Sequence, residues 1–424
     1  MTDARRSGLW RATLTLLAGG ALAQALPLLL GPWISRLYTP AEFGAYTAFW
    51  TVAANLAVVA CLRYEFALPL ERDESDARSL LALCLRLLLA MAAVSAVLAA
   101  VLAALGRLPH AAWLPGAVLA LGACQLATMW ANRSERFQAL AASRVLQHGG
   151  GAIGQVALGW GGASVLGLIA APMAAAAVAT LWLSRMPADL ARGLWQAVRR
   201  PAAGTLSAAW RRHRDFPLLN APHAFAGALQ DTLAVALLAA WSGDAAVGYW
   251  GLALRYLKAP ATLVGGAVSQ ALYPKLVSAS PAQARATVRQ VMALLGGVAV
   301  VLALLLFVAG PALFAAVFGE RWRVAGELAR ALSPYIALHF VASPLAVVTM
   351  AWRAQAWALR LALVGQVLFL VALALGLKLG GLMGAAWGVS AAMAAYFGLY
   401  FWRLATWRDI PAPADAEARD AAGA

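Results

Sequence analysis

The sequence predicts an all-α integral membrane protein with twelve transmembrane helices arranged in two six-helix lobes. Of its 424 residues, 63% are hydrophobic and 12% are charged, and the mean hydropathy is +0.74. Soluble domains are about 45–50% apolar and about 25% charged, so the excess is expected to face membrane lipids. The apolar residues gather in runs of the length that crosses ~30 Å of hydrocarbon. Strands of a β-barrel would alternate apolar and polar residues, and these runs do not.

The apolar runs predict the spans in order along the chain. The first six are 10–34, 43–64, 82–105, 113–131, 145–160 and 163–184. The second six are 216–241, 247–272, 290–310, 331–351, 359–377 and 381–402. We therefore expect an N-terminal lobe over 1–184, a basic cytoplasmic linker over 185–215, a C-terminal lobe over 216–407 and a disordered cytoplasmic tail over 408–424.

The distribution of Lys and Arg predicts the orientation. With the N-terminus inside, most of the 33 basic residues fall in cytoplasmic segments, so both termini should be cytoplasmic. Many of the 17 Trp residues lie at span ends, where an interfacial belt would place them. The net charge of +15 does not predict nucleic-acid binding, because the basic residues lie in short loops rather than on one polar face interleaved with aromatics.

The N-terminus has a competing interpretation as a signal peptide. Arg5, Arg6 and Arg11 precede an apolar run that contains the small-residue pattern Ala21-Leu22-Ala23. The apolar stretch continues past that pattern to Ile34, however, which is long enough to span a bilayer. We therefore expect an uncleaved first helix.

The two halves of the chain echo each other. The string TPAEFGAYTAFW (39–50) follows the first span, and SGDAAVGYWGLAL (242–254) follows the seventh. In each, a short polar turn precedes a Gly and a Tyr that open the next helix. Because both halves start inside, they form a parallel repeat about an axis along the membrane normal. This arrangement favours a transporter whose bundles rock about a central site; a structural repeat without transport is the alternative.

Ionisable residues inside predicted spans are the first candidates for function. Arg255 and Lys258 are three residues apart in the eighth span, so they share a helix face. Arginine offers a planar fork for phosphate oxygens and lysine a compact point charge. The alternative is that they snorkel or pair with Asp231, midway along the seventh span. Asp231 is a candidate for exchanging protons or binding Na⁺, although we favour the ion pair.

Asn220, His223 and Gln270 are further candidates in the second half. Asn220 and His223 lie lower on the seventh helix and either line a cavity or bond to a neighbour. His223 can titrate near neutral pH, but a single helical histidine is more often structural. Gln270 is a polar residue in apolar surroundings, which interhelical hydrogen bonding also explains.

Arg63 and Glu65 are expected to end the second helix on the cytoplasmic side. They serve either as a gate and docking point for an incoming anionic head group, or as a positive-inside anchor with a local ion pair. The acidic run that follows, Glu71 to Asp76, is predicted to be a solvated loop.

The motifs in this sequence that can indicate a cofactor or a metal site do not predict one here. Gly149-x-Gly151-x-x-Gly154 matches a dinucleotide fingerprint, but no strand precedes it, so we expect glycines that allow close helix packing. The three cysteines lack metal-ligand spacing. We expect no enzyme activity and no cofactor, apart from H⁺ or Na⁺ as a coupling ion.

Five strings, in order, resemble the Wzx-like oligosaccharide flippases, the polysaccharide-biosynthesis family of the multidrug/oligosaccharidyl-lipid/polysaccharide (MOP) exporter superfamily. They are ISRLYTPAEFGAY (34–46), LRYEFALPLERDESDA (62–77), VGYWGLALRYLKAP (247–260), AVSQALYPKL (267–276) and FGERW (318–322). The resemblance implies two MATE-like lobes around a central cavity, with Arg255 on the family's basic position. It also implies a bacterial inner-membrane protein that moves an undecaprenyl-pyrophosphate-linked oligosaccharide to the periplasmic leaflet by alternating access.

The same resemblance implies a role in O-antigen, capsule or exopolysaccharide assembly, alongside a polymerase and glycosyltransferases. Two alternatives stay open. One is another MOP-type exporter, of drugs or of a peptidoglycan-precursor lipid. The other is a membrane polysaccharide polymerase or ligase, which usually needs a sizeable outside domain, whereas the largest predicted outside loop, about 311–330, is short.

Overall fold

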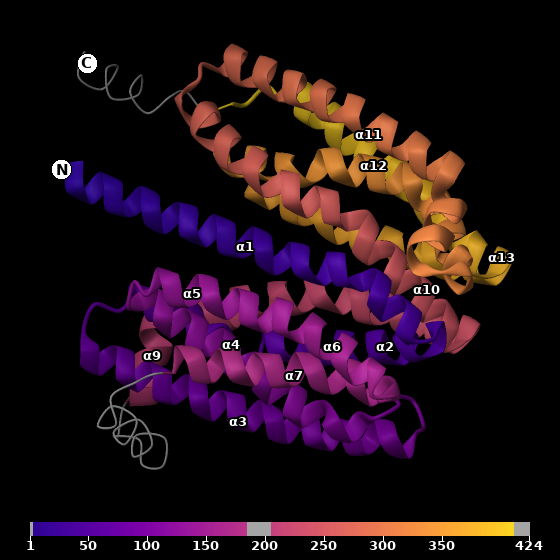
Figure 1. The fold of residues 1–424 in the computed structure, drawn as a ribbon. Helices are drawn as coiled ribbons and strands as arrows, with labels where there is room; N and C mark the ends of the chain where they lie inside the picture. Colours follow the sequence, from indigo (N-terminus) through magenta and orange to yellow (C-terminus); the bar gives the residue numbers. More distant parts are fainter. Residues whose placement is uncertain (1–2, 185–204, 411–424) are drawn as a thin grey trace. The chain divides into compact units, whose positions relative to one another are not determined.

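The computed structural model describes residues 3–184 and 205–410, and every regular element within those ranges is helical (Figure 1). Most of the predicted linker, and the predicted tail from 411 onward, lie outside the described residues. The chain divides into two compact units, Met1–Ala236 and Leu237–Ala424, which are described separately below.

Unit 1 contains α1 to α7, α9 and the start of α10. Its helices are α1 (Asp3–Leu37), α2 (Pro40–Val58), α3 (Glu74–Ala104), α4 (Leu114–Arg133), α5 (Phe137–Arg144), α6 (Gly150–Trp160), α7 (Ser164–Leu183) and α9 (Thr205–His213). Short 3₁₀ segments η1 (Tyr64–Leu70) and η2 (Ala111–Trp113) precede α3 and α4, and π-helical turns η3 (Val145–Gly149) and η4 (Phe216–Asn220) precede α6 and α10. Because η3 joins α5 to α6 without a break, the helix predicted over 145–160 begins earlier, at Phe137.

Local sequence signals explain where the helices of unit 1 begin. Thr39 and Glu42 form a capping box ahead of α2, with Pro40 in the first turn, where a missing N–H costs nothing. The Asp73 side chain accepts bonds from the N–H groups of Ser75 and Asp76 and so caps α3.

The glycines of the rejected fingerprint serve close packing. A Cβ on Gly154 would lie 3.0 Å from the Cβ of Ala171 in α7, and one on Gly149 would lie 2.6 Å from Cδ1 of Leu26 in α1. These glycines therefore let helices of unit 1 approach each other, as the sequence interpretation predicted.

Unit 2 contains the remainder of α10 (Ala221–Ser278), α11 (Pro281–Phe318), the 3₁₀ turn η5 (Glu320–Trp322), α12 (Arg323–Ala351) and α13 (Gln355–Ala405). Two of these long helices are broken by glycine. Gly243 interrupts α10 with φ of 78°, and Gly381 interrupts α13 with φ of 58°. Only glycine adopts such left-handed backbone readily. The breaks fall at the predicted boundaries between the seventh and eighth spans and between the eleventh and twelfth.

Several helices have the length and apolar surface to cross a membrane. Seven helical segments of the described residues qualify, and two of them, Phe216–Ser278 and Gln355–Ala405, contain the glycine breaks. Along α11, Leu294, Val301 and Val308 repeat every seven residues and are 66–73% exposed. A continuous apolar stripe of this kind is expected to face lipid. The exact number of twelve spans stays a prediction.

Candidate functional site

The chain leaves α2 earlier than the sequence predicted, and this places Arg63 in a turn. The helix ends at Val58 rather than continuing to 64. Leu62 and Arg63 then both have left-handed backbone, with φ of 49° and 66°. A left-handed residue cannot continue a right-handed helix. The expectation that Arg63 and Glu65 end the second helix is therefore wrong: Arg63 directly precedes η1, and Glu65 lies inside it.

Arg63 and Asn220, both predicted as substrate-binding residues, are in direct contact. Arg63 Nε donates a 2.8 Å hydrogen bond to Asn220 Oδ1, at the end of η4. The guanidinium also lies 4.0 Å from the centroid of the Phe66 ring. Asn220 is neutral, and within the part of the chain that the structure describes no carboxylate forms an ion pair with Arg63. The Arg63 charge is therefore not neutralised by direct contact, as an anion-binding group requires.

Glu65 is a buried carboxyl group close to Arg63. Only 3% of Glu65 is exposed, and its Oε2 atom has no hydrogen-bond partner. Burial raises the pKa of Glu65 to about 7, although its own backbone N–H and the charge of Arg63 act in the opposite direction. Glu65 can therefore take up or release a proton near neutral pH.

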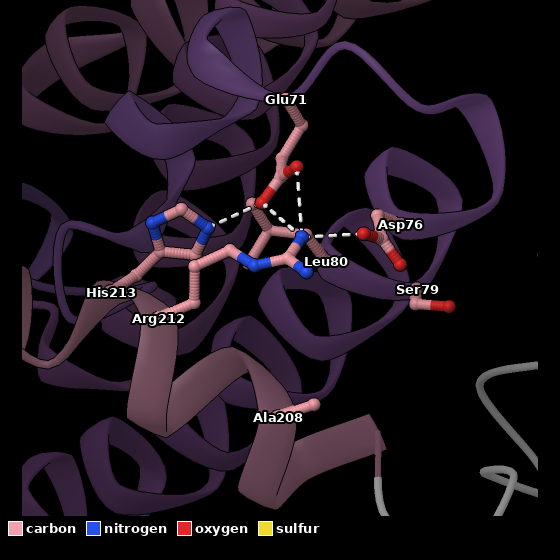
Figure 2. Close-up of a pocket in the computed structure, with 7 residues that line it drawn as sticks. All are labelled: Glu71, Asp76, Ser79, Leu80, Ala208, Arg212 and His213. Carbon is pink, nitrogen blue, oxygen red and sulfur yellow. Dashed lines mark hydrogen bonds and ion pairs between the residues drawn. The ribbon is translucent and has the colours of Figure 1, made fainter.

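A second cluster ties α9 to the start of α3, and we call it the α9 clasp: Glu71, Asp76, Arg212 and His213. Figure 2 shows the Glu71 carboxylate between the side chains of His213 and Arg212. His213 Nε2 lies 2.5 Å from Glu71 Oε1, and Arg212 Nη1 lies 3.2 Å from both Glu71 oxygens. Arg212 also pairs with Asp76. The Glu71 and His213 side chains are each 10% exposed, whereas Arg212 is 56% exposed.

The clasp corrects the expectation of a solvated acidic loop for Glu71, whereas Asp73 and Glu74 are exposed as predicted. Glu71 is nearly buried because α9 covers it, and Glu74 pairs with Arg78 and Arg133. With Ser79, Leu80 and Ala208, the clasp residues line a small pocket (Figure 2). The acidic groups of this pocket form ion pairs with its basic groups. We therefore interpret the pocket as the place where α9 is held against the start of α3, rather than as a ligand site. The attachment uses the same two segments, 63–76 and 212–220, that bring Arg63 to Asn220.

The other predicted residues of unit 1 lie on the first part of α10. His223 and Asp231 are both exposed. Next to Asp231, Thr232 Oγ1 accepts a 3.1 Å hydrogen bond from Nδ2 of Asn55, which is 4% exposed. This bond fixes the early part of α10 against α2. The roles of His223 and Asp231 stay predictions.

The predicted residues of unit 2 lie on the second part of α10. Arg255 and Lys258 are partly buried, and Gln270 is exposed. Lys258 is within electrostatic range of His339 on α12. The His339 ring lies 5.9 Å from Tyr335 and 6.2 Å from Phe397, measured between ring centroids. The sequence interpretation did not find this aromatic group, whose members are spread over two helices. The pairing of Asp231 with Arg255 or Lys258 stays a prediction.

Comparison with known proteins identifies the family. The model of the family described as "polysaccharide biosynthesis protein" matches residues 33–327, most of the chain. The chain belongs to the polysaccharide biosynthesis protein family. The matched range includes the Arg63 turn, the α9 clasp and both parts of α10. A search of curated proteins finds no match to this member of the family.

Solved structures show the fold of this family member. An inward-facing multidrug resistance MATE transporter of the MOP superfamily matches with a TM-score of 0.70 and 14% identity, covering 90% of this chain and 93% of the transporter. The lipid II flippase MurJ, in an inward closed conformation, matches with a TM-score of 0.66 and 9% identity, covering 92% and 90%. A mutant form of VcmN, a MATE transporter of Vibrio cholerae, matches with a TM-score of 0.53 and 16% identity, covering 94% and 95%.

These similarities establish the fold class. The protein has the all-α membrane fold of the MOP superfamily, as the resemblance implied. The three neighbours are described as transporters and a flippase. At 9–16% identity they establish the fold alone.

Proposed function

We propose that this protein is a flippase that moves an undecaprenyl-pyrophosphate-linked oligosaccharide from the cytoplasmic to the periplasmic leaflet of a bacterial inner membrane. The observation that carries the proposal is the family match over residues 33–327 together with a MOP fold. In this topology both termini are cytoplasmic, because that orientation places most Lys and Arg inside. The glycan then enters O-antigen, capsule or exopolysaccharide assembly, where glycosyltransferases and a polymerase act before and after the transfer.

The physical task is to carry a pyrophosphate and sugar hydroxyls across ~30 Å of hydrocarbon. An ionised group there costs at least several kcal/mol unless a wet, charged environment replaces its water. Arg63 is the first contact in the proposed path. Arg63 can exchange its hydrogen bond to the amide oxygen of Asn220 for one to a phosphate oxygen. Because Asn220 is neutral, phosphate binding at Arg63 does not have to break an ion pair first.

Deeper residues complete the proposed path. Arg255 and Lys258 provide positive charge for the head group, and Gln270 provides a hydrogen-bonding amide. Transfer is coupled to H⁺ or Na⁺, with Asp231, Glu65 and His223 as the candidate coupling groups or charge partners. The lobes alternate between inward-facing and outward-facing states around this path.

Leaflet-resolved labelling of the glycan carrier tests this proposal in cells. A strain without the protein is expected to accumulate unpolymerised lipid-linked units on the cytoplasmic leaflet. Complementation with the wild type restores transfer, whereas complementation with Arg63→Gln restores it much less. Arg72→Gln is the matched control, since Arg72 is an exposed arginine of the same loop. Normal transfer by Arg63→Gln at normal protein level would remove Arg63 from the path.

A second candidate function is the transfer of a peptidoglycan-precursor lipid, which the fold of the lipid II flippase favours. That function predicts accumulation of the precursor lipid, rather than of the oligosaccharide lipid, in the deletion strain. Drug export, a further function within the superfamily, predicts a changed drug-sensitivity panel. If the protein were instead a polymerase or ligase, the deletion strain would accumulate the glycan lipid on the periplasmic leaflet.

A further inference from the structure

One end of unit 2 gathers arginine and tryptophan side chains from three helices. Arg289 of α11 donates two hydrogen bonds, of 3.1 and 2.7 Å, to the carbonyl oxygen of Ala405 at the end of α13. The Trp407 ring, just beyond α13, lies 6.3 Å from the Trp352 ring, just beyond α12. The guanidinium of Arg403 lies 5.1 Å from the Trp407 ring. We call this group, with the exposed Arg353, the arginine–tryptophan rim: Arg289, Arg353, Arg403, Trp352 and Trp407.

The rim carries positive charge that carboxylates do not neutralise. Within the described residues, none of its three arginines forms an ion pair with an acidic side chain. All three are exposed. Two further exposed arginines, Arg360 and Arg408, lie close to the rim in sequence, together with the exposed carboxylate of Asp409. Positive charge therefore exceeds negative charge here, which favours an anionic ligand.

Two buried hydrogen-bond donors belong to the same end. Trp352 is 3% exposed, and its Nε1 atom has no partner. Arg285, four residues before Arg289 on α11, has a buried Nε atom that also has no partner. Native proteins rarely leave such atoms unpaired. Both atoms are donors, so the missing partner is an acceptor, such as a phosphate oxygen. Arg353 also occupies left-handed backbone, with φ of 53°, where glycine would be less strained.

We propose that the arginine–tryptophan rim binds the phosphate headgroup of an anionic phospholipid. The helix that supplies Arg289 also provides a surface for the acyl chains, because Leu294 and Val301, further along α11, are 70% and 66% exposed. A phospholipid satisfies the cationic rim and this apolar stripe together, whereas free phosphate satisfies only the rim. Tryptophan and arginine at the ends of membrane helices suit the headgroup region. This inference does not depend on the proposed transport.

Native mass spectrometry of the purified full-length protein, titrated with phosphatidylglycerol or phosphatidylcholine, tests the proposal. The wild type is expected to retain phosphatidylglycerol in preference to phosphatidylcholine. The double variant Arg353→Gln/Arg403→Gln should bind phosphatidylglycerol roughly 30-fold more weakly, from about 1 kcal/mol for each arginine near an anionic surface. The control Arg107→Gln/Lys378→Gln removes the same charge elsewhere and should leave the affinity unchanged.

A second variant separates loss of binding from loss of folding. Arg353→Lys/Arg403→Lys keeps the charge, so it should retain most of the preference for phosphatidylglycerol and also report whether these positions tolerate substitution. Equal binding of the two lipids by the wild type, or wild-type phosphatidylglycerol binding by the glutamine variant, would overturn the proposal.

The acidic tail of the chain is the competing occupant. Asp415, Glu417 and Asp420 follow the rim in sequence. Deletion of residues 411–424 should leave phosphatidylglycerol binding nearly unchanged if the lipid is the occupant. If the full chain binds no phosphatidylglycerol and binding appears only after this deletion, the tail occupies the rim and the proposal is wrong.

Discussion

Replacing Glu71 with alanine is expected to release α9 from the start of α3. The magnitude follows from the contacts of Glu71. Its bond to His213 joins two side chains that are each 10% exposed. A hydrogen bond to a charged group contributes about 1.5–3 kcal/mol, so its loss should favour the open state of α9 about 10- to 150-fold. Arg212 adds less, because it is 56% exposed and keeps its contact with Asp76.

Hydrogen exchange of the peptide covering residues 205–215, measured by mass spectrometry on the full-length protein in nanodiscs, reports this release. Exchange of α9 should accelerate strongly in Glu71→Ala and less in Arg212→Gln. The control is Glu74→Ala, which removes a 48% exposed carboxylate from the same segment and should leave α9 nearly unchanged. Unchanged exchange in Glu71→Ala, or a larger effect of Arg212→Gln, would refute the assignment of Glu71 as the centre of the clasp.

Three further predictions concern other parts of the chain. Arg255→Ala should abolish surface polysaccharide at normal protein level; full polymer from this variant would exclude Arg255 from the path. The native pKa of Glu65 is raised, so the folded state binds more protons and the melting temperature should fall as pH rises from about 4.5 to about 7. Glu65→Gln should remove that fall, and a persisting fall would assign it to another group. Gly326→Ala places a Cβ 2.5 Å from the oxygen of Gly310 and should cost about 1–3 kcal/mol in thermal unfolding, whereas Gly297→Ala, in open space, should cost nothing.

The sequence predicted the helices well because their signals are local. Runs of apolar residues define the spans, and glycine marks the interruptions at Gly243 and Gly381, where only a residue without Cβ fits easily. The end of α2 was not predicted, since Leu62 and Arg63 adopt left-handed backbone without a glycine to signal it. The strain there is maintained by tertiary contacts, which a local pattern does not contain.

The candidate site was predicted in part, for a similar reason. Arg63 and Asn220 were each identified as polar residues near span ends, but their contact joins positions 157 residues apart. Glu71 and His213 are 142 residues apart. The acidic run from Glu71 to Asp76 and the basic end of α9 are each typical of a solvated surface. Only the position of α9 in the structure shows that Arg212 and His213 pair with this acidic run. The position of Lys258 near His339 likewise depends on how α10 and α12 pack.

Reconstitution tests the central claim most directly. Purified protein is placed in vesicles that carry an undecaprenyl-pyrophosphate-linked oligosaccharide, and the glycan exposed on each leaflet is labelled over time. The account predicts that the wild type moves the glycan between leaflets. Arg63→Gln should slow this movement at least about tenfold, because it removes one charge-assisted hydrogen bond. Arg72→Gln should not slow it. Protein-free vesicles moving the glycan as fast as wild-type vesicles, or equal rates for wild type and Arg63→Gln, would contradict it.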